Sequence, residues 1–355
     1  AVSPHDPCQE ALFMSRAGSG SLPRYILQRI LLMIPMVWVI LTLVFFILRV
    51  APGDPVSAAL GGKLNEQALE QRREALGFNR PLIVQYWDYL SSVLHLDFGT
   101  TFSDNQPVLH VIRDNGGATL MLTVAAFVFA LVLGIPLGLL AGRYRDTAPD
   151  VVIRLFGILT YAAPVFFLGF LFQYYLAEPL GLPTSGDASP ITVFTVPTKT
   201  HILLVDAILS GNTEATQDVL RHLILPAFTL GLIVCGVFIR LVRVNMLQTM
   251  QTDYVEAAEA RGLKRRHVTW RHGFRNALVP VITVIGLQFA LLLGGAILTE
   301  QTFNWPGLGH KLVLYINNRD YGAVQGIVTF FAIAVVLISL LVDIVNALID
   351  PRVRY

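Results

Sequence analysis

Six long apolar runs restrict the folds that are open to this chain. They cover residues 25–50, 119–142, 151–177, 223–242, 278–299 and 323–349. A hydrocarbon layer of about 30 Å requires about 20 apolar residues in a helix, so each run is long enough to cross a membrane. Only 14% of the residues are charged and the mean hydropathy is +0.61. The runs therefore predict an all-α polytopic membrane protein with six transmembrane helices.

The distribution of basic residues predicts the orientation of these helices. Lys and Arg gather in four segments on one side of the predicted spans, at residues 15–29, 142–150, 242–277 and 350–355. Cytoplasmic segments near membrane helices carry an excess of Lys and Arg, so both termini are predicted to be cytoplasmic. Residues 51–118 and 178–222 then form two external segments, and residues 243–277 form the largest cytoplasmic loop.

The two external segments differ in pattern. In the first, Ile83, Trp87, Leu90 and Leu94 recur at helical spacing, which predicts a helix that lies at the membrane interface or forms a small external cap. The second is interrupted by prolines and is expected to be irregular, with one short helix at residues 203–209.

Several function classes find no support in the sequence. Residues 1–22 are polar, and we expect a disordered tail or an extension ahead of a permease domain at residues 23–355. The net charge of +2 gives no reason to propose nucleic acid as a partner. The two cysteines and eight histidines lack the spacing of a metal site, so no metal is expected. The phosphate-binding pattern G-x-x-x-x-G-K-[ST] does not occur in the sequence. Gly61-Gly62-Lys63 resembles its end but is followed by Leu64 and not by Ser or Thr. We expect no cofactor on this chain and no enzymatic activity of its own.

The large cytoplasmic loop contains a short helical pattern. Asp253 can cap a first turn, Glu256 can reach back to it, and Gly262 fits just past the end as a left-handed cap. Two turns are too short to be stable alone in water, so a partner surface must hold this helix. By composition alone, it could be a plain linker between spans or part of a basic patch attracted to anionic lipid.

The residues of this loop resemble the cytoplasmic signature of ABC importer permeases. The shared pattern is Asp253-Tyr254-x-Glu256-Ala257-Ala258-x-x-x-Gly262, followed by Leu278-x-Pro280. Further segments resemble the dipeptide/oligopeptide branch of that family: APGDP at residues 51–55, LGFNRPL at 76–82, DFG at 97–99, RNALVP at 275–280, EQTFNWPGLG at 300–309 and DPRVRY at 350–355. Residues 113–118 and the long 182–220 region depart from the family pattern.

The resemblance implies a fold, partners and a contact site. The fold is the type I ABC importer permease architecture in a bacterial inner membrane. The chain is similar to the subunit with the long first external loop, whose partners are a second homologous permease, one or two cytoplasmic ATP-binding subunits and an extracytoplasmic solute-binding protein. ATP and Mg would bind to the partner subunits. The implied ATPase contacts are Asp253, Tyr254, Glu256, Ala257, Ala258, Gly262 and Leu263. Peptides are the implied cargo, and nickel, glutathione or sugars are alternatives within the same class.

Polar residues in or near the spans are candidates for the transport pathway or its gate. The candidates are Gln173, Gln288, Glu300, Asn304 and Trp305. Asp343 is expected to pair with a basic residue, and Arg243 is expected to extend toward the inner surface. An ATP-independent channel or a secondary transporter is the alternative of another class. It predicts charged residues near several helix midpoints, and the spans carry few.

Overall fold

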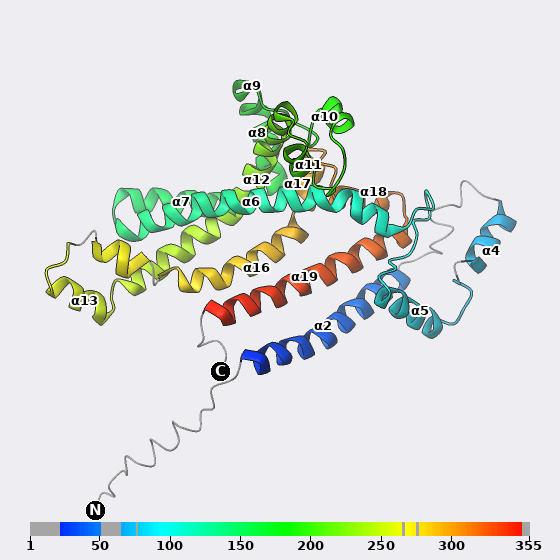
Figure 1. The fold of residues 1–355 in the computed structure, drawn as a ribbon, viewed down its shortest axis with the longest axis horizontal. Coiled ribbons are helices and arrows are strands. Elements are labelled where there is room, and N and C mark those ends of the chain that lie inside the picture. The colour runs from blue at the N-terminus through cyan, green and yellow to red at the C-terminus, as the bar shows by residue number, and fades with distance from the viewer. Residues whose placement is uncertain (1–21, 51–64, 76, 265–266, 275–276, 350–355) are drawn as a thin grey trace, which may run out of the picture.

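Helices make up the body of the molecule. The computed structural model describes residues 22–50, 65–75, 77–264, 267–274 and 277–349 (Figure 1). Within these ranges the chain forms helices joined by turns, with one isolated bridge between Thr100 and Pro107 and no β-strand. This confirms the predicted all-α class. The predicted tail at residues 1–21 and the motifs at 51–55 and 350–355 lie outside the described ranges.

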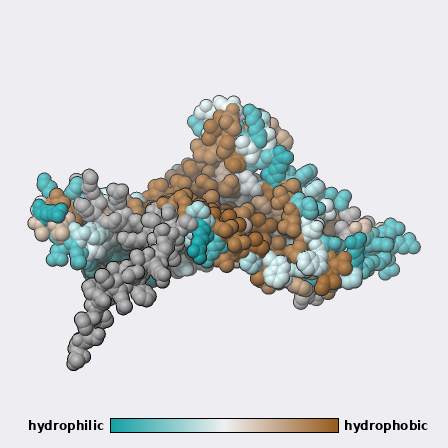
Figure 2. All heavy atoms as spheres, turned by 60° about the horizontal axis from the view of Figure 1, so that its bottom comes forward, coloured by the Kyte–Doolittle hydropathy of each residue, from teal (hydrophilic) through white to brown (hydrophobic). Residues whose placement is uncertain are grey.

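Four long helices are apolar enough to cross a membrane. They are α2 (Leu22–Val50), α6 (Val108–Arg143), α12 (Thr213–Thr249) and α19 (Tyr321–Ile349). They run along the long axis of the molecule in Figure 1. Figure 2 shows apolar residues over the middle of the molecule, with hydrophilic residues gathered at the end that carries α13 and at the opposite end that carries α4. The long axis of the molecule would therefore pass through the membrane, with the two polar ends outside the hydrocarbon layer.

Residues 151–177, the third predicted span, do not form a single helix as predicted. It is divided into α7 (Ala148–Ala162) and α8 (Val165–Tyr175), which meet at an angle of 108°. Pro164 has no N–H to continue the helix, and Ala163 before it adopts the extended backbone with φ −75° and ψ 135°. The turn between the helices therefore starts at the residue that proline restricts.

The fifth predicted span, residues 278–299, is also not one long helix. α16 (Val279–Gly295) is largely apolar but contains Gln288, and Ala296 separates it from α17 (Ile297–Thr302). Gly294 and Gly295 weaken the helix at its end. The described ranges thus contain four spanning helices, or five if α7 and α8 form one bent span. The prediction of six spans is not confirmed.

Glycines bring α6 and α12 into close contact. An added Cβ at Gly134, Gly138 or Gly142 would lie 2.7–2.9 Å from the Cβ atoms of Phe238, Val242 and Met246, respectively. Both sets repeat every four residues, so one stripe of each helix faces the other. Only glycine allows the backbones to approach this closely. This stripe holds the two helices at the centre of the largest buried cluster.

The remaining helices lie at the ends of the bundle. α5 (Leu82–Leu94) confirms the helix predicted from Ile83 to Leu94, and α11 (Leu203–Leu209) confirms the second predicted external helix. Among the elements that were not predicted are α4 (Glu66–Ala75), α9 (Ala177–Leu180) and α10 (Pro190–Thr195). α18 (Leu308–Asn317) precedes α19, while α13 (Asp253–Ala260) and the π-helical segment η1 (Val268–Phe274) follow α12.

Candidate functional site

The first candidate site is the short helix α13, which lies at the end of the molecule opposite α4 and α5 (Figure 1). Its first turn is closed by the carbonyl of Thr252, which accepts hydrogen bonds from the amides of Val255 at 2.9 Å and Glu256 at 3.3 Å. Asp253 is therefore the first helical residue and not the cap, so α13 begins one position earlier than predicted. Asp253 and Glu256 place negative charge in the first turn, where the helix dipole favours it.

The end of α13 matches the prediction. Gly262 adopts φ +78°, and the amide of Leu263 donates to the carbonyl of Ala258 at 3.4 Å. This is the six-residue hydrogen bond of a Schellman motif, with glycine in the left-handed position. No heavy atom of the residues that the structure describes lies within 4 Å of an added Cβ at Gly262, and its left-handed backbone conformation favours glycine here.

α13 has an inner and an outer face. Val255 and Ala258 are 2% and 5% exposed and pack against Val268 of η1, with Met250 beside them. The outer face carries Asp253, Tyr254, Glu256, Ala257, Gly262 and Leu263, all of which are exposed. Ala258 shares the inner face with Val255, because residues three apart in a helix lie on one face.

The contacts of η1 connect α13 to the rest of the bundle. An added Cβ at Gly273 would lie 2.8 Å from the Cε atom of Met246 and the Sδ atom of Met250. Met246 also lies against Gly142 of α6, as described for the glycine stripe. A force on α13 therefore reaches α12 and α6 through packed side chains.

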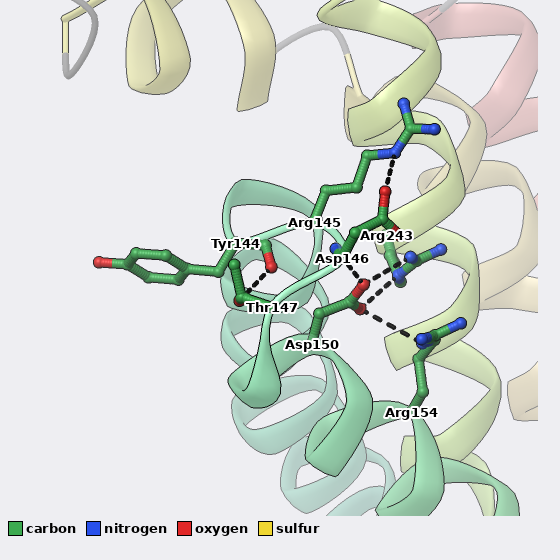
Figure 3. Close-up of polar contacts among 7 residues, drawn as sticks. All are labelled: Tyr144, Arg145, Asp146, Thr147, Asp150, Arg154 and Arg243. Atoms are coloured by element: carbon green, nitrogen blue, oxygen red, sulfur yellow. Dashed lines mark hydrogen bonds and ion pairs between the residues drawn. The ribbon is translucent and has the colours of Figure 1, made fainter.

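A buried ion pair joins α7 to α12 at the same end of the molecule (Figure 3). Nε and Nη2 of Arg243 donate to the two carboxylate oxygens of Asp150, both at 2.7 Å. The Asp150 side chain is fully buried and that of Arg243 is 15% exposed. The amide of Asp146 also donates to Asp150, and Arg154 lies 3.5 Å away. The prediction that Arg243 extends to the surface is therefore wrong, because a bidentate carboxylate partner holds the guanidinium inside.

Gln173 lies beside the segment that carries three of the other candidate pathway residues. Gln173 of α8 donates from Nε2 to the carbonyls of Thr184 and Thr302, which ties α8 to α17. Thr302 lies between Glu300 and Asn304 in the sequence. Gln288 of α16 is partly buried.

Glu300 and Trp305 belong to one buried cluster next to α6. The Glu300 carboxyl group accepts hydrogen bonds from the Thr119 hydroxyl at 2.7 Å and the His310 amide at 2.8 Å. The Trp305 indole donates to the carbonyl of Ala118 at 2.9 Å. Both side chains are fully buried, whereas Asn304 between them is exposed with φ +47°. This cluster anchors the start of α18 to α6.

Asp343 pairs with a basic residue, as predicted. Its Oδ2 lies 3.3 Å from Nη1 of Arg29, which joins α19 to α2. Within the described ranges, no three His, Cys, Asp or Glu side chains are grouped in a way that could hold a metal ion.

Long apolar helices, with the short exposed helix α13 in the loop after α12, are typical of a multi-pass membrane protein. Comparison with known proteins identifies its family. The family described as "Binding-protein-dependent transport system inner membrane component" matches residues 134–355, and its N-terminal companion matches residues 22–123. The chain belongs to this family of inner-membrane transport subunits.

Two relatives illustrate the similarity. The dipeptide transport system permease protein DppB of Alkalihalophilus pseudofirmus is 35% identical over 332 residues, which cover 93% of this chain and 99% of the relative. The glutathione transport system permease protein GsiC of Salmonella choleraesuis shows the same identity and coverage. Both names denote permease proteins of transport systems.

Proposed function

We propose that this chain forms half of the translocation pathway of an ATP-driven peptide importer, and that α13 receives the motion of a cytoplasmic ATPase. The exposed outer face of α13 carries the proposal. Val255 and Ala258 attach α13 to η1. An ATPase that binds Tyr254, Glu256 and Ala257 would therefore move α13 and η1 together. The family, whose members serve binding-protein-dependent transport, supports the same role.

The proposed topology has six crossings and cytoplasmic termini. α7 with α8 would form the third crossing, and α16 with the start of α17 the fifth. The two polar ends in Figure 2 support this placement, because α13 then lies in the cytoplasm and α4 and α5 lie outside. Residues 243–277 would form the coupling loop, and residues 51–118 and 178–222 the external segments.

The proposed partners divide the work of transport. A second homologous permease would complete the pathway, one or two cytoplasmic subunits would bind ATP and Mg, and a solute-binding protein would deliver cargo to the external side. A conformational change of this kind requires nucleotide or cargo to bind the two states with different affinity. This chain would bind no cofactor of its own.

The proposed pathway elements are Gln173, Gln288, Glu300, Asn304 and Trp305. Glu300 and Trp305 would act by holding α18 against α6, because both are fully buried. Asn304 is exposed and could contact a partner or cargo directly. Peptides are the proposed cargo, since relatives are named for dipeptide and glutathione transport. Nickel and sugars are the alternatives within this class.

Uncoupling of transport from ATP hydrolysis tests the role of α13. The chain is reconstituted with its partner subunits in proteoliposomes, and peptide uptake and ATP hydrolysis are measured together. Glu256→Lys and Gly262→Asp should leave the complex folded and hydrolysing ATP but should abolish uptake. Gln251→Lys is the matched control, since Gln251 is exposed just before α13. Normal uptake in both α13 variants would contradict the proposal.

Transport without ATP would favour the other class. If proteoliposomes that contain this chain alone moved peptide without ATP, the chain would be a channel or a secondary transporter. We expect no uptake from the chain alone.

A further inference from the structure

Two arginines bracket the apolar part of α2. Arg29 and Arg49 are 20 positions apart, and residues 30–48 between them carry no charge. At 1.5 Å per residue this separation is about 30 Å, the thickness of the hydrocarbon layer. Each guanidinium group therefore lies at the depth of one layer of lipid headgroups when α2 crosses the membrane.

The two arginines differ in their partners. Arg29 pairs with the carboxylate of Asp343. The Arg49 guanidinium instead stacks on two aromatic rings, at 5.1 Å from the centroid of Phe45 and 4.4 Å from that of Phe78. Its Nε is buried and has no hydrogen-bond acceptor among the described residues. The aromatic rings hold the cation and orient it, but they do not satisfy its N–H groups.

Arg49 lines a cavity of about 310 Å³ between α5 and the ends of α2 and α19. Gln85 of α5 lines the same cavity, and its Oε1 is also buried without a hydrogen-bond partner among the described residues. Two carboxylates also lie on the cavity wall. Asp88 pairs with Arg80 at 3.1 Å, and Asp97 accepts a hydrogen bond from the amide of Gly99 at 2.9 Å. Among the described residues, neither carboxylate forms an ion pair with Arg49.

The outer surface of α5 indicates that lipid is the neighbour. Ile83 and Trp87 are 70% and 63% exposed, and Leu94 is still more exposed. The opposite side of α5 is tied to the spans, since Tyr86 hydrogen-bonds Thr42 and Tyr89 hydrogen-bonds Thr329, both at 2.7 Å. An amphipathic helix that is attached to two membrane helices and carries Trp on its free apolar face suits the membrane interface.

We propose that Arg49 binds the phosphate group of a membrane phospholipid, with the headgroup in the cavity beneath α5. The exposed side chains of Phe46 and Ile47, next to Arg49 on α2, would contact the acyl chains. A planar guanidinium donates hydrogen bonds to phosphate oxygens, and the Nε of Arg49 lacks an acceptor among the described residues. The site requires only that α2 spans the membrane and is independent of the role proposed for α13.

Native mass spectrometry of the purified full-length chain tests this site. Protein is extracted in mild detergent, and bound phosphatidylglycerol is measured during titration with that lipid. Arg49→Gln should weaken binding of the tightest lipid about tenfold or more, because it removes a charge-assisted hydrogen-bond pair. Arg80→Gln is the matched control, since Arg80 lines the same cavity but already pairs with Asp88. Arg80→Gln should bind lipid like the unmodified chain.

Two further arms keep the result interpretable. Arg49→Lys retains the charge but loses the planar fork, so its lipid affinity should fall between those of Arg49 and Arg49→Gln. Titration with inorganic phosphate at millimolar concentration should not displace the lipid. Equal lipid binding by Arg49→Gln and the unmodified chain would overturn the proposal. Full displacement by inorganic phosphate would also overturn it, because the ligand would then be a free anion.

Discussion

Asp150→Asn should destabilise the folded chain by about 3 kcal/mol. Asp150 is fully buried and accepts two hydrogen bonds of 2.7 Å from Arg243. Removing one partner of a buried ion pair costs about 3–5 kcal/mol, because the other charge remains buried and unpaired. The lower end of this range applies, since the Arg243 side chain is 15% exposed and can recover some hydration.

The loss is measured by unfolding in mixed micelles of a mild detergent and sodium dodecyl sulfate, followed by circular dichroism. Asp146→Asn is the matched control. Asp146 forms an exposed pair with Arg145, and Asn tolerates its left-handed backbone, so no measurable change is expected. The double variant Asp150→Asn/Arg243→Met should be more stable than Asp150→Asn alone, because no unpaired guanidinium is buried.

A loss below about 1 kcal/mol for Asp150→Asn would refute this reasoning, because it would mean that water replaces the carboxylate at little cost. An equal loss in Asp146→Asn would refute it as well. In that case the α6–α7 turn as a whole, and not the buried pair, would determine the stability of this end of the bundle.

Three further predictions concern other parts of the fold. Gly138→Leu should destabilise the chain by about 1–3 kcal/mol in the same unfolding assay, because its Cβ would already lie 2.8 Å from α12. Gly262→Ala should lower the protection of α13 in hydrogen exchange more than Gly262→Asn does, since Asn tolerates φ +78° better than Ala. Asp206 should anchor α11 at neutral pH. Burial raises the pKa of Asp206, but hydrogen bonds from Thr200 and Lys199 outweigh it and lower the pKa below its ordinary 3.8. The anchor should therefore persist at pH values above 3.8 and be lost only at more acidic pH, as hydrogen exchange of α11 would show.

The sequence predicted the elements whose signals are local. The long apolar runs located α2, α6, α12 and α19, and the left-handed cap at Gly262 follows from that residue alone. The short helix expected at residues 203–209 is α11. In each of these elements, nearby residues along the chain decide the conformation.

Proline shows where local signals fail. Pro35, Pro136 and Pro226 lie inside continuous helices, whereas Pro164 follows a break of 108°. In membrane helices the neighbouring segments determine whether a proline is accommodated, so the sequence does not distinguish these cases.

Contacts between distant segments were also beyond the sequence. Asp150 and Arg243 are 93 positions apart, and neither has a local pattern that indicates the other. The sequence did not indicate that Ala258 is buried, because Val268, which packs against it, lies beyond the turn that follows α13. Which side of a short helix is buried depends on which later residues pack against it.

Site-specific cross-linking tests the central claim, contact between α13 and the ATPase. Cysteine is placed at Ala257 on the outer face of α13 in a background with Cys8→Ala and Cys235→Ala, and the assembled complex is treated with a short bifunctional thiol reagent. Tyr144→Cys is the control, since Tyr144 is exposed at the α6–α7 turn. We predict a cross-link to the ATP-binding subunit from position 257 that changes with ATP, and none from position 144. Cross-linking from position 144 alone would contradict the proposed coupling role of α13.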